Sequence, residues 1–410
     1  QDLLQESAKL HMRADVPLGV YLSGGLDSSI VACLANSHGQ GQLLGFHGKF
    51  SAAGPEYDES QHARAVGAHC DFGVHELEIT AGDFLENIRQ VIYHLDYPVA
   101  GPGSFPQYMV SQMAAKHRKV VLGGQGGDEI FGGYTRYLVA YFEQCIKAAI
   151  EGTAQNGNFV VTYESIIPNL STLRDYKPML QDFWREGLFE SMDRRYFRLV
   201  NRSGVLQEEI NWDCLTDYSP FESFQKIFKG QNVGKESYFD QMTHFDFKTL
   251  LPALLQVEDR VSMAHGLESR VPFLDHPLVE LAATIPSNIK FRNGALKNVL
   301  KHTAKDILPK SVFNRQDKMG FPTPINQWAT KEAKEFIFDV FSSSQAQGRA
   351  LINNKSVLSG LSNGQSKYGR KLWGLLCLEL WQQEFHDKAQ TFRDIVKNRR
   401  DRQLTTKESS

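Results

Sequence analysis

A short polar segment, Ser23 to Ser29 (SGGLDSS), constrains the fold of this chain more than any other feature. The apolar run Val16 to Leu22 before it is typical of a buried strand, and the pattern from Ser28 to Asn36 after it is typical of a helix. A glycine-containing turn between a strand and a helix lets backbone N–H groups approach an anion, which the helix start also stabilises. The sequence therefore predicts an anion-binding strand–loop–helix unit.

The same alternation continues along the first third of the chain. Further strands are expected at 42–46, 74–79 and 119–122, with helices at 59–68 and 107–117. Strands that alternate with helices predict an α/β fold with a doubly wound parallel sheet.

From about residue 137 the pattern becomes mainly helical. Helices are expected at 184–202, 250–263, 278–285, 296–308 and 372–385, and a loop at 152–163. We expect an α/β core over 1–136, a mainly helical part over 137–390, and a polar, flexible tail over 391–410.

Charge and cysteine usage exclude several classes of protein. The 45 basic and 47 acidic residues nearly balance, so there is no electrostatic case for a nucleic-acid-binding face. The five cysteines are scattered without a CxxC pair, which argues against a disulfide framework or a zinc site and favours a reducing, cytoplasmic compartment. No apolar run is long enough for a membrane span, so no membrane partner is expected.

The polar residues of the first loop suit phosphate chemistry. Ser23, Ser28 and Ser29 offer hydroxyl donors, and the Asp27 carboxylate is suited to a magnesium ion that bridges phosphate oxygens. The loop lacks GxxxxGK[ST], so it is not the nucleotide loop that serves γ-phosphate transfer. A glycine turn with a serine or aspartate cap and no ligand is the alternative interpretation.

A second glycine-containing loop, Gly123 to Tyr134 (GGQGGDEIFGGY), follows the fourth predicted strand. Six glycines in the eleven residues before Tyr134 indicate a backbone wrapped closely around something. Because ligands bind at the carboxyl ends of strands in open α/β sheets, both loops are expected at one edge. Asp27 and Asp128 would then share one magnesium ion.

These motifs resemble a known family. SGGLDSS is similar to the pyrophosphate loop of the ATP-pyrophosphatase superfamily, and GGDEIFGGY resembles the corresponding motif of asparagine synthetases. The likeness continues through Leu255 to Asp275 (LQVEDRVSMAHGLESRVPFLD), Lys297 to Lys301 (KNVLK) and Arg315 to Phe321 (RQDKMGF). It covers nearly the whole chain except about 140–240 and the tail.

The resemblance implies a role for each matching residue. Lys297 would contact the α-phosphate, where its charge stabilises the reacting group, and with Asp27 and Asp128 it would form the catalytic set. Asp27 and Asp128 would hold magnesium. The implied ATP and pyrophosphate contacts are Leu22, Ser23, Gly24, Gly25, Asp27, Ser28, Ser29, Leu44, Gly123 and Gly124, with Leu22 and Leu44 framing the adenosine near the ends of their strands.

Gln125 and Glu129 are the candidates for the substrate pocket. Gln125 stands where many asparagine synthetases have an acidic residue facing the amino-acid substrate, and it brings no negative charge for a substrate ammonium. A further group, Asp259, Arg260, Glu268 and Arg270, is expected to form buried ion pairs that shape the pocket floor.

The resemblance implies ATP-dependent amide formation with ATP and Mg²⁺. A carboxylate, with the aspartate side chain as first choice, would be adenylated with release of pyrophosphate, and ammonia would then give the amide and AMP. Glutamine-dependent members begin with a glutaminase domain that has an N-terminal cysteine. The pyrophosphate loop comes too early for that domain to precede it here, so we expect it to be removed or to be a separate chain, with removal favoured.

Three alternatives stay open. A relative of the β-lactam synthetases or lasso-peptide cyclases would act on a different carboxylate, such as a surface-sugar acid, a peptide or a β-lactam precursor. An RNA-modifying enzyme with this loop is disfavoured by the balanced charge, and a catalytically silent nucleotide-binding protein by the intact Asp27, Asp128 and Lys297. The sequence does not fix the oligomeric state; a homodimer is one option.

Overall fold

A parallel sheet of five strands, in the order β3-β2-β1-β4-β5, forms the centre of the protein. The computed structural model describes residues 1–39, 43–98, 101–151, 177–231, 233, 238–315, 322–362 and 369–408. The strands are β1 (Leu18–Tyr21), β2 (Leu44–Lys49), β3 (Gly73–Glu78), β4 (Val120–Leu122) and β5 (Glu268–Arg270). Val20 of β1 pairs with Gly45 on one side and with Leu122 on the other, so the central strand is covered on both edges.

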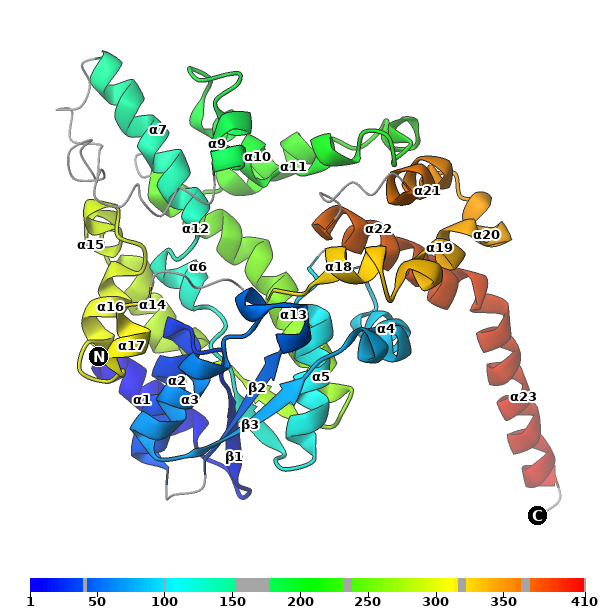
Figure 1. The fold of residues 1–410 in the computed structure, drawn as a ribbon, viewed down its shortest axis with the longest axis horizontal. Helices are drawn as coiled ribbons and strands as arrows, with labels where there is room; N and C mark the ends of the chain where they lie inside the picture. The colour runs from blue at the N-terminus through cyan, green and yellow to red at the C-terminus, as the bar shows by residue number, and fades with distance from the viewer. Residues whose placement is uncertain are drawn as a thin grey trace.

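Helices cover both faces of the sheet, as Figure 1 shows. They are α1 (Asp2–His11), α2 (Leu26–His38), α3 (Ser60–Cys70), α4 (Ala81–Leu95) and α5 (Ser104–Ala115). Val20 and Leu122 point into a core shared with α1, α2 and α3, whereas Tyr21 and Val121 point into a second core shared with α4 and α5. Successive strand residues therefore face opposite cores, which is the pattern of a sheet buried on both faces.

A third core lies among helices above the carboxyl ends of the strands (Figure 1). These helices are α7 (Thr135–Glu151), α9 (Lys177–Phe183), α10 (Met192–Val200), α11 (Pro220–Phe228) and α12 (Tyr238–Lys248). The flanking helices α6 (Gly127–Phe131) and α13 (Leu250–Met263) contribute buried residues to the two cores at the sheet instead. Aromatic rings dominate this core, and Tyr196 lies stacked on Phe228. Aromatic rings bury large apolar areas, so they contribute much of the stability of this core.

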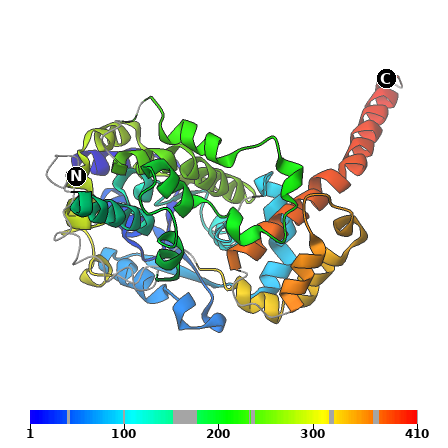
Figure 2. The same cartoon turned by 90° about the horizontal axis from the view of Figure 1, so that it is seen from above.

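The rest of the chain returns to both sides of the sheet. The first group is α14 (His276–Thr284), α15 (Ser287–Lys290), α16 (Asn298–Ala304) and α17 (Lys310–Phe313). The second is α18 (Ile325–Thr330), α19 (Lys334–Ser342), α20 (Ser344–Gln347), α21 (Asn354–Ser362), α22 (Gly369–Trp381), the π-helix η8 (Gln382–Asp387) and α23 (Ala389–Glu408). Figures 1 and 2 both show α23 extending away from the body of the protein.

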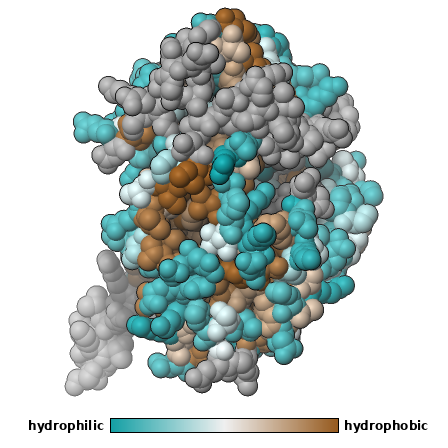
Figure 3. Space-filling view, turned by 90° about the vertical axis from the view of Figure 1, so that its left-hand side faces the viewer, coloured by the Kyte–Doolittle hydropathy of each residue, from teal (hydrophilic) through white to brown (hydrophobic). Residues whose placement is uncertain are grey.

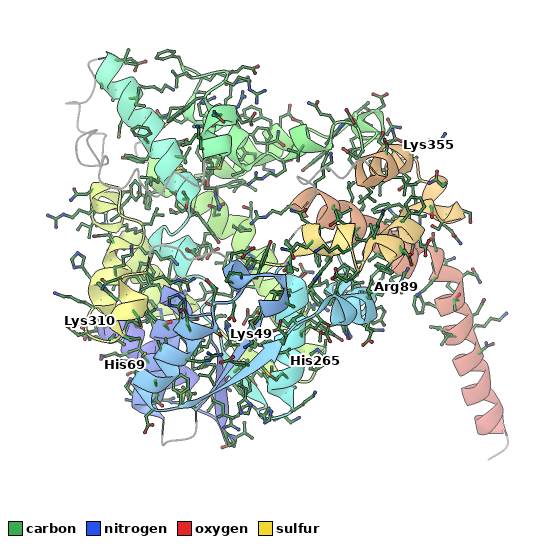
Figure 4. All side chains as sticks on the ribbon, in the orientation of Figure 1. Lys49, His69, Arg89, His265, Lys310 and Lys355 are labelled. Carbon is green, nitrogen blue, oxygen red and sulfur yellow. The ribbon has the colours of Figure 1, made fainter. Side chains whose placement is uncertain are left out.

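Side-chain contacts tie these returning helices to the α/β core. His69 of α3 contacts the carbonyl of Ile307, just before α17, at 3.1 Å, and Figure 4 shows His69 near Lys310 of α17. Arg89 of α4 donates to Glu384 of η8 at 2.8 Å, and it lies on the side of α4 that faces the C-terminal helices (Figure 4). Both groups of returning helices thus contact the first third of the chain.

The surface mixes polar and apolar side chains. The face that carries α14 to α17 exposes both kinds, as Figure 3 shows, and Leu281 and Ile289 are among its exposed apolar residues. Within the described ranges, no helix combines the length and the apolar character that crossing a bilayer requires.

The predicted fold class is confirmed, and so are the four predicted strands in their order. The fifth strand, Glu268–Arg270, was not predicted. The helix expected over 184–202 is wrong in its first half, because α10 begins only at Met192. The Arg195 guanidinium instead donates hydrogen bonds to the carbonyls of Phe183 and Glu186, so these carbonyls have partners without a helix. The loop expected at 152–163 lies outside the described residues.

Candidate active site

The first loop leaves β1 at Leu22 and enters α2 at Leu26. It is held by its own hydroxyl groups: Ser23 Oγ and Ser28 Oγ lie 2.9 Å apart, and the backbone N–H of Gly25 donates to Ser23 Oγ at 3.3 Å. Ser28 and Ser29 are buried in the first turn of α2. The loop is therefore preformed at the helix start, where backbone N–H groups favour an anion.

The second loop lies directly against the first. It leaves β4 at Leu122 and enters α6 at Gly127. A Cβ placed on Gly124 would come within 2.8 Å of the Ser28 backbone nitrogen. The structure thus brings Gly123 and Gly124 to the edge of the sheet where the Ser23–Ser29 loop lies, as the order of the parallel strands requires.

Lys297 joins the two loops. Its Nζ lies 2.5 Å from Asp27 Oδ2 and 2.6 Å from Asp128 Oδ1, and its side chain is only 8% exposed. Burial lowers the pKa of Lys297, but the charges of Asp128 and Asp27 outweigh it, so the net pKa is raised and the ammonium form persists. The backbone of Lys297 is left-handed, with φ of 53°, which a residue with a side chain adopts only when its surroundings hold it there.

Gly133 allows this approach. A Cβ on Gly133 would lie 1.8 Å from Asp128 Oδ1 and 2.1 Å from Lys297 Cε. The backbone N–H of Gly133 also donates to the Asp128 carbonyl at 2.9 Å, which fixes the turn after α6. Any side chain at residue 133 would separate the lysine from Asp128.

The two carboxylates suit a magnesium ion that is shared with phosphate. Asp27 and Asp128 come from different loops, yet both reach one ammonium nitrogen. In the described part of the chain, no group of three or more histidine, cysteine, aspartate or glutamate side chains could hold a metal by itself. Magnesium is commonly bound by one or two carboxylates and completes its shell with phosphate oxygens and water, so this pair fits it.

Gln125 and Glu129 have different surroundings. Gln125 is half-buried and donates from Nε2 to Glu258 Oε2 at 3.4 Å. Glu129 is buried and accepts a hydrogen bond from the Tyr134 hydroxyl. Burial raises the pKa of Glu129 to about 7. The nearby Asp128 charge also raises this pKa, whereas the hydrogen bond from Tyr134 lowers it.

Leu44 is not brought to this edge of the sheet. It is the first residue of β2 and pairs with Gly19 near the start of β1, so its predicted place near the end of the strand is wrong. His47 takes that place instead: its Nδ1 lies 2.8 Å from the carbonyl oxygen of Leu22. His47 was missed because the sequence prediction ended this strand at residue 46.

A second residue that sequence reasoning left without a role is Arg315. It is buried, pairs with Glu59 ahead of α3, and donates from Nη1 to the Gly24 carbonyl at 3.3 Å. The motif RQDKMGF contains it, but only the fold shows that it holds the backbone of the first loop.

The buried ion pairs expected for the pocket floor are absent from the described structure. Arg260 pairs with Asp96 at 2.9 Å, but both side chains are more than 40% exposed, and Glu268, paired with Arg270, is also exposed. The buried acid is Glu258, one position before Asp259. A shift of one residue turns a side chain by about 100° around a helix, so Asp259 and Arg260 face outward.

Comparison with known proteins shows the family of this chain. The asparagine synthase family model matches residues 1–383. The chain is 30% identical over 390 residues to asparagine synthetase [glutamine-hydrolyzing] 1 of Bacillus subtilis, which covers 93% of this chain and 58% of that relative. It is also 30% identical to a putative asparagine synthetase [glutamine-hydrolyzing] of Mycobacterium bovis, over 92% of this chain and 56% of the relative.

A shorter match reaches asparagine synthetase B [glutamine-hydrolyzing] of Escherichia coli, with 36% identity over 144 residues, 32% of this chain and 26% of the relative. The chain spans just over half the length of the first two relatives. With a family model over almost its whole length, this chain belongs to the asparagine synthase family.

Proposed function

We propose that this chain forms an amide in an ATP-dependent reaction by way of an acyl-adenylate. The observation that carries the proposal is the meeting of Lys297 with Asp27 and Asp128 beside a preformed anion loop. One buried positive charge and two carboxylates beside this loop support the binding of nucleotide phosphates here.

In the first step, an oxygen of the substrate carboxylate attacks the α-phosphorus of ATP. The new P–O bond forms as the bond to the β-phosphate breaks, and pyrophosphate leaves. The backbone N–H groups of the Ser23–Ser29 loop hold the pyrophosphate, and the Lys297 ammonium stabilises charge at the α-phosphate. Asp27 and Asp128 would hold Mg²⁺, which neutralises phosphate charge when bound.

In the second step, ammonia attacks the carbonyl carbon of the acyl-adenylate. The C–N bond forms, the bond to the AMP oxygen breaks, and the amide, AMP and one proton are released. Positioning of the two reactants supplies most of the acceleration. Leu22 and the Gly123–Gly124 backbone are proposed to contact the adenosine, since both lie at the edge of the sheet where the loops meet.

The acceptor we propose is the side-chain carboxylate of aspartate, with asparagine as product. The relatives named asparagine synthetase support this choice. Their printed names also say glutamine-hydrolyzing, so we propose that ammonia is supplied by a glutaminase domain, in the same polypeptide or in a partner.

Exchange of labelled pyrophosphate into ATP tests the proposal, because it needs neither ammonia nor a glutaminase. With magnesium and a panel of carboxylates, we expect exchange that depends on aspartate and is lost in Asp27→Ala. Exchange with another carboxylate alone would replace aspartate as the acceptor. No exchange with any carboxylate, in folded protein that binds ATP, would overturn the adenylating mechanism.

A further inference from the structure

Glu258, a buried acid, lies behind the second loop. Glu258 of α13 is only 4% exposed, and no lysine, arginine or histidine of the described chain pairs with it. Burial raises the pKa of Glu258, while hydrogen bonds from Ser269 and Gln125 oppose the rise. A buried carboxylate that lacks a cation is costly, so its presence beside the active-site loop calls for an explanation.

Three neutral donors surround this carboxylate. Ser269 Oγ, from β5, donates to Glu258 Oε1 at 2.6 Å. Gln125 Nε2, from the second loop, and Gln107 Nε2, from α5, both lie 3.4 Å from Glu258 Oε2. Glu258 thus links the second loop to a strand and a helix of the core.

The carboxylate also packs against the loop backbone. A Cβ on Gly123 would lie 2.6 Å from Glu258 Oε1. Gly123 is the first residue after β4, and its N–H donates to the Arg270 carbonyl at 2.7 Å. The negative charge therefore lies directly under the loop that carries Gln125 and, three residues later, Asp128.

Donors from Ser269, Gln125 and Gln107 face the two Glu258 oxygens, and these contacts suit the ionised form, which accepts hydrogen bonds and donates none. It therefore holds the NH₂ group of Gln125 toward itself and turns the amide oxygen away from Glu258. That oxygen becomes an acceptor, and the carboxylate behind it adds a negative potential to the same place. Both features favour a cationic hydrogen-bond donor such as an ammonium group.

We propose that Glu258 is a positioning residue for the acceptor substrate. It orients Gln125 and supplies the buried negative charge, and in this way it selects a carboxylic acid that carries an ammonium group. The inference rests on the proposed function for the identity of the reaction, but the Glu258–Gln125 pairing is independent of it. The two parts call for separate measurements.

The substrate part is tested by kinetics of pyrophosphate exchange with aspartate and with succinate, which lacks the ammonium group. In Glu258→Gln, we expect KM for aspartate to rise about tenfold or more, KM for ATP to stay within about twofold, and the preference for aspartate over succinate to fall. Ser269→Ala is the matched control, because it removes a donor to Oε1 and leaves Gln125 bound; it should keep the preference. An unchanged preference in Glu258→Gln overturns the proposal.

The pairing part is tested by thermal unfolding of Gln125→Glu, Glu258→Gln and the double variant. Gln125→Glu places a second carboxylate against the buried Glu258 and should lower the melting temperature by about 2 °C or more. The double variant restores one acid and one amide and should recover most of that loss. If the changes in melting temperature of the two single variants simply add in the double variant, the pairing is overturned. This outcome can be read even if the wild-type protein shows no exchange and the proposed function fails. If Glu258→Gln alone does not fold, recovery in the double variant still decides.

Discussion

Lys297 and Asp27 are 270 positions apart in the sequence, yet their Nζ and Oδ2 atoms lie 2.5 Å apart. With Asp128 on its other side, the Lys297 ammonium pairs with two carboxylates that come from two different loops. Phosphates and a divalent cation would have to share this space with the lysine. In the protein alone, the Lys297 ammonium therefore supplies a positive charge to both carboxylates.

The first prediction follows from that balance. In Lys297→Met, Asp27 and Asp128 lose the ammonium group that they share, so we expect a loss of stability of about 3–5 kcal/mol and the loss of pyrophosphate exchange. Magnesium without ATP should then raise the melting temperature of Lys297→Met more than that of the wild type. Adding Asp27→Asn to the variant should remove this extra shift. Equal magnesium shifts in wild type and Lys297→Met would contradict the prediction.

Gly133 gives the second prediction. Gly133→Ala puts a methyl group 1.8 Å from Asp128 Oδ1, so the loop must move and the lysine must lose one partner. We expect exchange to fall by about 100-fold, the scale of effect for a displacement of about 1 Å in an active site. Gly374→Ala in α22 is the control, since a Cβ there meets nothing within 4 Å, and it should leave exchange unchanged. Comparable rates for the two variants would show that the close approach is not needed.

The third prediction concerns Arg315, which binds both Glu59 and the Gly24 carbonyl. Lysine has the charge but not the fork that serves two acceptors at once. In Arg315→Lys we expect KM for ATP in the exchange assay to rise about tenfold, because the first loop loses an anchor. Arg64→Lys alters an exposed arginine–glutamate pair and should leave KM unchanged. A normal KM in Arg315→Lys would assign Arg315 to stability alone.

The sequence predicted those parts of the site that depend on local patterns. A strand, a polar glycine turn and a helix follow one another around Ser23–Ser29, and the order of parallel strands puts Asp128 on the same edge as Asp27. Lys297 gave no such signal, because it approaches from a position far along the chain, just before α16, and only the family resemblance singled it out.

Other features depended on register or on distant contacts. β5 has only the three residues ESR, too short and too polar to display a strand pattern, and it exists because β4 offers it an edge. Leu44 lies at the start of its strand and not near the end, because β2 runs from Leu44 to Lys49, three residues beyond the predicted end. Glu258 was overlooked in favour of Asp259 because the direction in which each side chain points depends on how α13 is rotated against the sheet.

His47 gives a pH-dependent prediction. Burial lowers the pKa of His47 below its ordinary value of 6.5. The contact with Leu22 and the nearby acids raise this pKa, but burial has the larger effect. The folded protein therefore favours the neutral imidazole ring. The unfolded chain then binds more protons, and stability is lost as the pH falls below 6.5. Melting temperatures measured from pH 7.5 to 5 should fall less in His47→Asn, which can still donate to Leu22. Identical pH profiles would show that other groups cause the acid sensitivity.

The last prediction concerns the aromatic core of the helical half. Arg195 and Glu143 are fully buried and form a two-pronged pair, with Nε–Oε1 at 2.8 Å and Nη2–Oε2 at 2.6 Å, and Arg195 also binds the carbonyls of Phe183 and Glu186. Arg195→Met leaves the Glu143 carboxylate buried without a cation, which should cost about 3–5 kcal/mol in the free energy of unfolding.

Arg185→Met is the matched control, because Arg185 pairs with Asp182 on the surface and should contribute less than about 1 kcal/mol. The double variant Arg195→Met/Glu143→Leu removes both buried charges, so it should regain part of the stability that Arg195→Met loses. Unfolding followed in urea at neutral pH would measure all three. If Arg195→Met is no less stable than Arg185→Met, the pair does not hold α7 to α10, and the aromatic rings around Tyr196 must hold these helices by themselves.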